Sequence, residues 1–193
     1  MDMNYTVVET SKLAAVRGGA HIYSLICDED IQNGHIGYVG LLADGVEGQE
    51  TYEFGIFDEA TLGKRKAVLV ANPEWNYDEC NRKNQALYNF INEAGVPFRG
   101  FDLIYGDVFA DTEGAFDATG VEAIEKDQYV ILAAGATTMK IVATEAETEG
   151  AGFVGVIEGK AKRGQGWVAK GGKAYGRPYD VYFVRVLKNE VIA

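Results

Sequence analysis

The chain has 193 residues, of which 47 % are hydrophobic and 24 % charged; these values are typical of a globular protein and exclude an intrinsically disordered one. The formal net charge of −11 disfavours direct binding of nucleic acid, and no apolar run is long enough to span a membrane. The chain holds 24 glycines but only two histidines and two cysteines, a composition that favours a turn-rich β protein acting by binding rather than by catalysis.

Short apolar runs separated by turn residues predict strands throughout the first half of the chain. These strands cover residues 5–9, 13–17, 21–27, 35–42, 51–57 and 67–71. Asn33-Gly34 and Asp44-Gly45 are typical hairpin turns, because these residue types tolerate positive φ. We therefore expect consecutive strands to pair antiparallel.

One α-helix is predicted over residues 76–94. Its apolar positions follow the i, i+3, i+4, i+7 spacing of a single helix face and are Leu87, Phe90, Ile91 and Ala94. Asn76 with Glu79 three positions later resembles an N-terminal capping pair, and Gly95 followed by Val96-Pro97 would end the helix. The helix is expected to lie across one sheet.

The second half returns to strands, predicted over residues 102–110, 128–134, 139–144, 153–159 and 181–187. Residues 150–155 spell G-x-G-x-x-G, but an acidic stretch precedes them and a β-like run follows, so a strand flanked by turns explains these glycines better than a dinucleotide site. The expected fold class is mainly β, with antiparallel barrel- or sandwich-like sheets and one helix. We expect one compact β-rich domain over residues 1–193, with residues 95–100 as the boundary if it divides.

The residue types needed for catalysis or metal binding are sparse. His21, Cys27, Asp28 and His35 are metal-ligand types, but their spacing matches no zinc pattern, so neither a metal nor a cofactor is expected. Cys80 falls in the first turn of the predicted helix, where the helix dipole could activate a thiol nucleophile. A thiol enzyme built on Cys80 is thus one alternative, although a small buried packing role is the favoured interpretation.

Charge and aromatic residues point instead to a surface for protein binding. Residues 1–159 carry a net charge of −17 and residues 160–193 a net charge of +6, so the basic segment at 160–173 is either a solvated loop or docks on an acidic surface of its own or a neighbouring subunit. Rings beside cations are typical of sites that stack on sugars or bases and of protein interfaces, and the acidic charge favours the interface. The candidate interface residues are Lys160, Lys162, Arg163, Trp167, Lys170, Lys173, Tyr175, Arg177, Tyr179, Trp75 and Tyr77.

Four stretches of the chain carry a resemblance to a known group of proteins. They are AVLVANPEWNYDE, ALYNFINEAG, PFRGFDLIYGDVFA and GRPYDVYFVRVLKN, at residues 67–79, 86–95, 97–110 and 176–189. Over residues 5–189 the chain resembles small proteins encoded in the structural gene clusters of tailed bacteriophages, which often decorate or cement the capsid. The resemblance implies a non-enzymatic virion protein that binds the outer surface of the shell, with no catalytic residues to carry over.

The implied partner is the major capsid protein of a phage shell, and the implied assembly is a homo-oligomer, since such proteins often form trimers. The expected location is the virion surface after synthesis in the host cytoplasm, because the N-terminal sequence lacks the basic and apolar regions of a secretory signal. A head-fibre base or another virion component fits the length as well. A carbohydrate-binding β module that uses Trp75, Tyr77 or Trp167 as stacking platforms is a further alternative.

Overall fold

The computed structural model describes residues 5–45, 50–74, 87–164, 167–168, 174–175 and 178–192. In this part of the chain, β-strands alternate with loops and short 3-10 helices, which confirms the prediction of a mainly β fold. The 3-10 helices are η1 (Ala15–Arg17), η2 (Leu87–Asn89), η3 (Glu113–Ala115) and η4 (Glu145–Thr148). No helix in these ranges is long and apolar enough to cross a membrane.

Five strands close into a barrel, in the order β2-β4-β3-β5-β6. Their bounds are β2 (Ile22–Ile26), β3 (Ile36–Leu42), β4 (Thr51–Gly55), β5 (Val68–Val70) and β6 (Phe98–Asp102). Only the β2–β4 pair of this barrel is parallel. The interior is filled by Leu25, Phe54, Val68, Val70 and Phe98, all buried.

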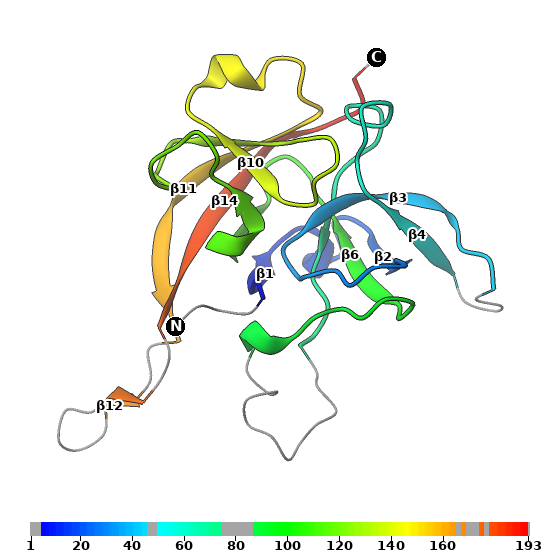
Figure 1. Cartoon of the computed structure of the whole chain (residues 1–193), viewed down its shortest axis with the longest axis horizontal. Helices are drawn as coiled ribbons and strands as arrows, with labels where there is room; N and C mark the ends of the chain where they lie inside the picture. Colours follow the sequence, from blue (N-terminus) through cyan, green and yellow to red (C-terminus); the bar gives the residue numbers. More distant parts are fainter. Residues whose placement is uncertain are drawn as a thin grey trace.

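A second sheet of seven strands lies beside the barrel (Figure 1), in the order β1-β7-β14-β11-β9-β10-β8. All its neighbours pair antiparallel except β10 and β8. The strands are β1 (Val8–Lys12), β7 (Val108–Thr112), β8 (Phe116–Asp117), β9 (Tyr129–Leu132), β10 (Met139–Val142), β11 (Phe153–Arg163) and β14 (Tyr179–Asn189). Two short strands, β12 (Trp167–Val168) and β13 (Ala174–Tyr175), form a ladder of their own.

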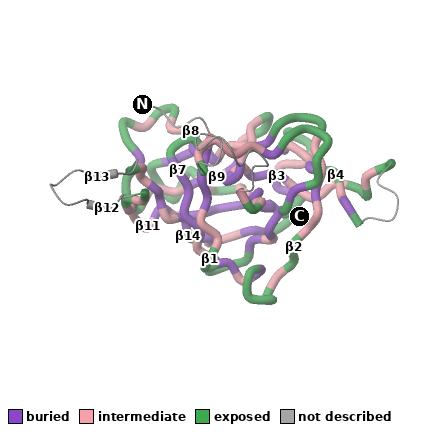
Figure 2. The backbone as a smooth tube through the Cα atoms, turned by 90° about the horizontal axis from the view of Figure 1, so that it is seen from below, coloured by how far each residue is buried: buried purple, intermediate pink, exposed green. Residues whose placement is uncertain are grey.

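The barrel and the large sheet share one hydrophobic core. In β5, Val68 and Val70 belong to the cluster inside the barrel, whereas Leu69 belongs to the cluster outside it. This second cluster also holds Phe109 and Val184 of the large sheet, so buried backbone runs continuously between the two units (Figure 2). A strand buried on both faces explains why residues 67–71 are an unbroken apolar run.

The α-helix prediction is wrong over residues 87–94, while residues 75–86 lie outside the described part of the chain. Leu87–Asn89 is a single 3-10 turn, and the chain beyond it bridges to Ile31. Asn92 exchanges both of its backbone hydrogen bonds with Ile31, and its side-chain Nδ2 donates to the Ile31 carbonyl oxygen at 2.9 Å. The backbone groups therefore bond to a distant segment instead of continuing a helical ladder.

Two further expectations for the first half are corrected. The strand predicted over residues 13–17 is wrong: Ala15–Arg17 form η1, and the chain leaves it through Gly18 at φ +80°. Asn33-Gly34 does not join paired neighbours: β2 pairs with β4 and β6, whereas β3 pairs with β4 and β5. The hairpin expected around Asp44-Gly45 is confirmed, because β3 and β4 pair antiparallel on either side of it.

Candidate functional site

The most distinctive feature of the surface is a long β-hairpin that extends beyond the large sheet. β11 and β14 have eleven residues each and pair from Phe153 opposite Asn189 to Arg163 opposite Tyr179. On the outer sides of this pair, β9 covers β11 only at residues 154–156, and β7 covers β14 only at residues 181–185. We call the uncovered part that extends from the sheet the arm: β11 from Glu158 onward, β12, β13, and β14 up to Asp180.

β12 continues the arm away from the body of the protein (Figure 1), and β13 pairs with it. Trp167 stands opposite Tyr175 in their ladder, so two of the candidate interface residues occupy one cross-strand pair. This pairing was not among the strands predicted from the sequence.

The β11–β14 part of the arm, which we call its root, is fixed to β1 at Arg163 by a charged and aromatic cluster. Arg163 donates from Nε to Glu9 Oε1 at 2.5 Å and from Nη2 to Glu9 Oε2 at 2.9 Å, a bidentate pair. The Arg163 guanidinium lies 5.7 Å from the centre of the Phe183 ring, and Lys12 Nζ lies 5.8 Å from the same ring. Glu9, Lys12 and Phe183 were not among the sequence candidates, since nothing local indicates that residue 9 meets residue 163.

Other charges of the basic segment also have partners within the chain. Lys162 Nζ lies 3.0 Å from Asp180 Oδ1. Outside this segment, Arg185 of β14 pairs with Glu158 of β11. Tyr179 is half-buried, and burial, followed by the nearby Glu9 carboxylate, raises the pKa of its hydroxyl. The positive charge of the basic segment is thus partly neutralised within its own subunit, as expected if the segment docks on an acidic surface of the same chain.

Lys160 differs from these residues because it is exposed and makes no ion pair within the described ranges. The remaining candidates, Lys170, Lys173, Arg177, Trp75 and Tyr77, lie outside the described residues. The structure therefore brings Lys160, Lys162, Arg163, Trp167, Tyr175 and Tyr179 together along one hairpin.

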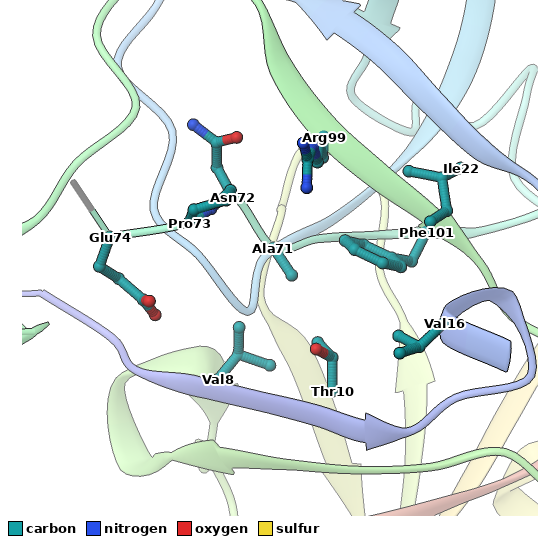
Figure 3. A pocket seen from close by; sticks show the side chains of 10 residues that line it. All are labelled: Val8, Thr10, Val16, Ile22, Ala71, Asn72, Pro73, Glu74, Arg99 and Phe101. Carbon is teal, nitrogen blue, oxygen red and sulfur yellow. The ribbon is translucent and has the colours of Figure 1, made fainter.

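A cavity of about 310 Å³ lies between β1, η1 and the outer wall of the barrel (Figure 3). Its lining is mostly apolar, and Arg99 and Glu74 are its charged members. The lining residues are Val8, Thr10, Val16, Ile22, Ala71, Asn72, Pro73, Glu74, Arg99 and Phe101. Such a mixed lining offers contact area and a few polar groups, but no pair of side chains arranged for proton transfer.

Where the barrel meets the large sheet, polar groups are buried. Desolvation lowers the pKa of His35 from 6.5 to about 4, and its Nδ1 lies 2.7 Å from the Thr137 hydroxyl. Desolvation raises the pKa of Asp111 well above its ordinary value, although the Thr112 amide donates to its Oδ1 at 2.8 Å. The Cβ of any residue replacing Gly34 would stand 1.9 Å from Asp111 Oδ2, so these groups are closely packed.

The other residues tested for chemistry do not converge. His21 is exposed on the barrel and packs beside Tyr23, whereas His35 contacts Thr137. Within the ranges described, no three His, Cys, Asp or Glu side chains gather as a metal site would require. Cys27 is a free, partly buried thiol, and Cys80 lies outside the described residues. Gly150 and Gly152 precede β11 in a turn and a bend, and Gly155 lies within β11, which confirms the interpretation as a strand flanked by turns.

Comparison of the chain with protein-family models, with curated proteins and with solved structures found no match.

Proposed function

We propose that the chain is a non-enzymatic structural protein of a tailed bacteriophage that binds the outer surface of the capsid and stabilises it. The observation that carries this proposal is the arm, a long hairpin fixed to the body of the protein by the Arg163–Glu9 pair. Aromatic residues supply most of the anchoring contacts of protein interfaces, and the arm carries two of them, Trp167 and Tyr175, at opposed backbone positions. The partner is the major capsid protein, and several copies of the chain act together as a homo-oligomer such as a trimer.

The body suits a protein that must hold its shape while bound to a large neighbour. The barrel has no free edges, and its outer wall packs into the core of the large sheet through Ile36, Leu69 and Phe101. An interface presented on such a body loses little conformational entropy on binding. The bidentate Arg163–Glu9 pair extends this order to the root of the arm.

The proposal is tested by co-sedimentation of the purified protein with capsids of the virus that encodes it. The wild-type protein is expected to sediment with the shells, and a variant in which residues 164–178 are replaced by a two-residue turn is expected to remain in solution. Thermal unfolding of both proteins verifies that the shortened variant is folded. Failure of the wild-type protein to bind shells would reject the proposal, and light scattering of the free protein gives its oligomeric state.

A carbohydrate-binding role is a second candidate, because the position of Trp167 on the outlying ladder would suit a stacking platform. A glycan array separates the two functions. Signal that disappears in Trp167→Ala would favour sugar binding, whereas a blank array together with shell binding favours the structural role.

A further inference from the structure

The outer edge of β11 is open along the arm. The last bonds across this edge join Ile157 to the neighbouring segment: the Asp127 amide donates to the Ile157 carbonyl at 2.8 Å, and the Ile157 amide donates to the Gln128 carbonyl at 2.8 Å. Asp127 has φ +68°, the one positive φ of a non-glycine residue in the described chain, and here the backbone turns away. Past this point no described strand pairs with β11 on that side, so among the described residues, residues 158–163 form an unpaired edge.

A groove of about 460 Å³ lies directly beside this edge. Its floor is apolar and consists of Ile124, Ile157 and Tyr182, each at most 8 % exposed. Its far wall, residues 123–126, is held by Gln128, whose Oε1 accepts from the Glu125 amide at 2.9 Å and whose Nε2 donates to the Ala123 carbonyl at 3.2 Å. The groove is therefore preformed and follows the line that β9 would take if it continued.

The charges around the groove select the kind of strand that fits. Lys126 and Lys160 are exposed lining residues without ion pairs in the described structure, and Glu125 is the single carboxylate of the lining. A second copy of the same edge would bring Lys160 and Lys162 against lysines, an arrangement that like-charge repulsion disfavours. An extended segment that carries acidic side chains gains from the same lysines.

We propose that this edge and groove receive an extended acidic segment of the shell protein, which adds to the large sheet as a strand beside β11. Main-chain hydrogen bonds to residues 158–163 supply affinity, while the apolar floor and the two lysines select the sequence of the added strand. This inference rests on the proposed capsid-binding function and identifies the surface that carries it out.

The test measures hydrogen–deuterium exchange of the protein alone and bound to purified capsids of the virus that encodes it. Amides of residues 158–163 are expected to become protected on binding. A wild-type protein that binds shells without this protection would overturn the inference and leave the proposed function standing, whereas a wild-type protein that does not bind shells would remove both. Protection that grows with concentration in the absence of shells, together with a doubled mass, would also overturn it, because the occupant would be a second copy.

A charge-reversal pair tests the choice of an acidic partner. The variant Lys126→Glu/Lys160→Glu is expected to weaken shell binding about tenfold, and the loss should shrink in high salt. The matched control is Lys64→Glu/Arg65→Glu, two exposed residues elsewhere that change the net charge by the same amount and should leave affinity within about twofold. Equal losses in the two variants would mean that overall charge, not this groove, governs binding.

Discussion

The burial of His35 makes a quantitative prediction about how stability depends on pH. Its pKa in the folded protein is about 4, whereas an unfolded chain has the ordinary value of 6.5, so the unfolded state binds the proton first as the pH falls. The contribution of this group is therefore complete above pH 6.5 and is lost progressively as the pH falls toward 4.

The size of the loss follows from the two pKa values. At pH 5, proton binding to His35 raises the statistical weight of the unfolded state by a factor of about 33 and that of the folded state by a factor of about 1.1. The ratio of about 30 corresponds to a loss of about 2 kcal/mol in the free energy of unfolding relative to pH 7.5. This is a substantial share of the stability of a small protein.

The assay is urea denaturation at pH 7.5 and pH 5 of the wild-type protein, of His35→Gln and of His21→Gln. His35→Gln is expected to be less stable than the wild type at pH 7.5, because the contact with Thr137 is altered. On acidification its free energy of unfolding should fall by about 2 kcal/mol less than that of the wild type. His21 is exposed, and His21→Gln controls for removal of a histidine. Asp111 titrates in all three proteins, so its contribution cancels in the comparison. Equal pH slopes for the wild type and His35→Gln would refute the reasoning.

Two further predictions concern the junction of the sheets and the root of the arm. Gly34→Ala and Gly120→Ala both place an alanine at positive φ, at +85° and +96°, but only the new Cβ at position 34 meets a neighbour, Asp111. Chemical denaturation should therefore show Gly34→Ala to be less stable than Gly120→Ala by about 2 kcal/mol. Equal losses of stability would mean that the residues around Asp111 move to accommodate the new methyl group. Glu9→Gln removes the carboxylate that binds Arg163, so hydrogen–deuterium exchange of the amides of residues 179–183 should become faster at low salt. At high salt, where the ion pair is screened, the variant should differ less from the wild type. Unchanged exchange at low salt would show that the contact of Arg163 with the Phe183 ring is enough to hold the arm.

The mainly β fold could be predicted because its signals are local. Runs such as residues 67–71 and 153–159 are strongly β-forming, and turn glycines mark their ends. The partners of these strands could not be predicted, because pairing depends on groups distant in the sequence. Asn33, placed in an apparent hairpin turn, is in fact buried, and its side chain donates to the Asn72 carbonyl at 2.9 Å.

The helix at 76–94 shows the limit of periodicity as a signal. Apolar residues at helical spacing also suit a loop whose backbone bonds to another segment, as Ala94 does through its amide to Asp30 Oδ1 at 2.9 Å. Strand β6 escaped notice for the opposite reason, since Arg99 and Gly100 interrupt its apolar pattern. Gly100 is needed there because a Cβ would stand 2.2 Å from Leu25 Cδ1 inside the barrel.

Only part of the arm could be predicted from the sequence. The change of net charge after residue 159 and the aromatic residues beyond it predict a binding surface in this region. Its root could not be found in the same way, because Arg163 and Glu9 are 154 positions apart. The open edge of β11 depends on the turn at Asp127, where an aspartate rather than a glycine adopts positive φ.

The continuity of β14 has a mechanical consequence. This strand runs from the arm into the centre of the large sheet, where β7 and β11 flank it on either side. Hydrogen bonds between antiparallel strands lie perpendicular to the strand axis, so tension along the arm loads both flanking ladders in shear, many bonds at once. A pull across the arm would instead peel the bonds apart one after another, and the protein should resist force far better in the first direction than in the second.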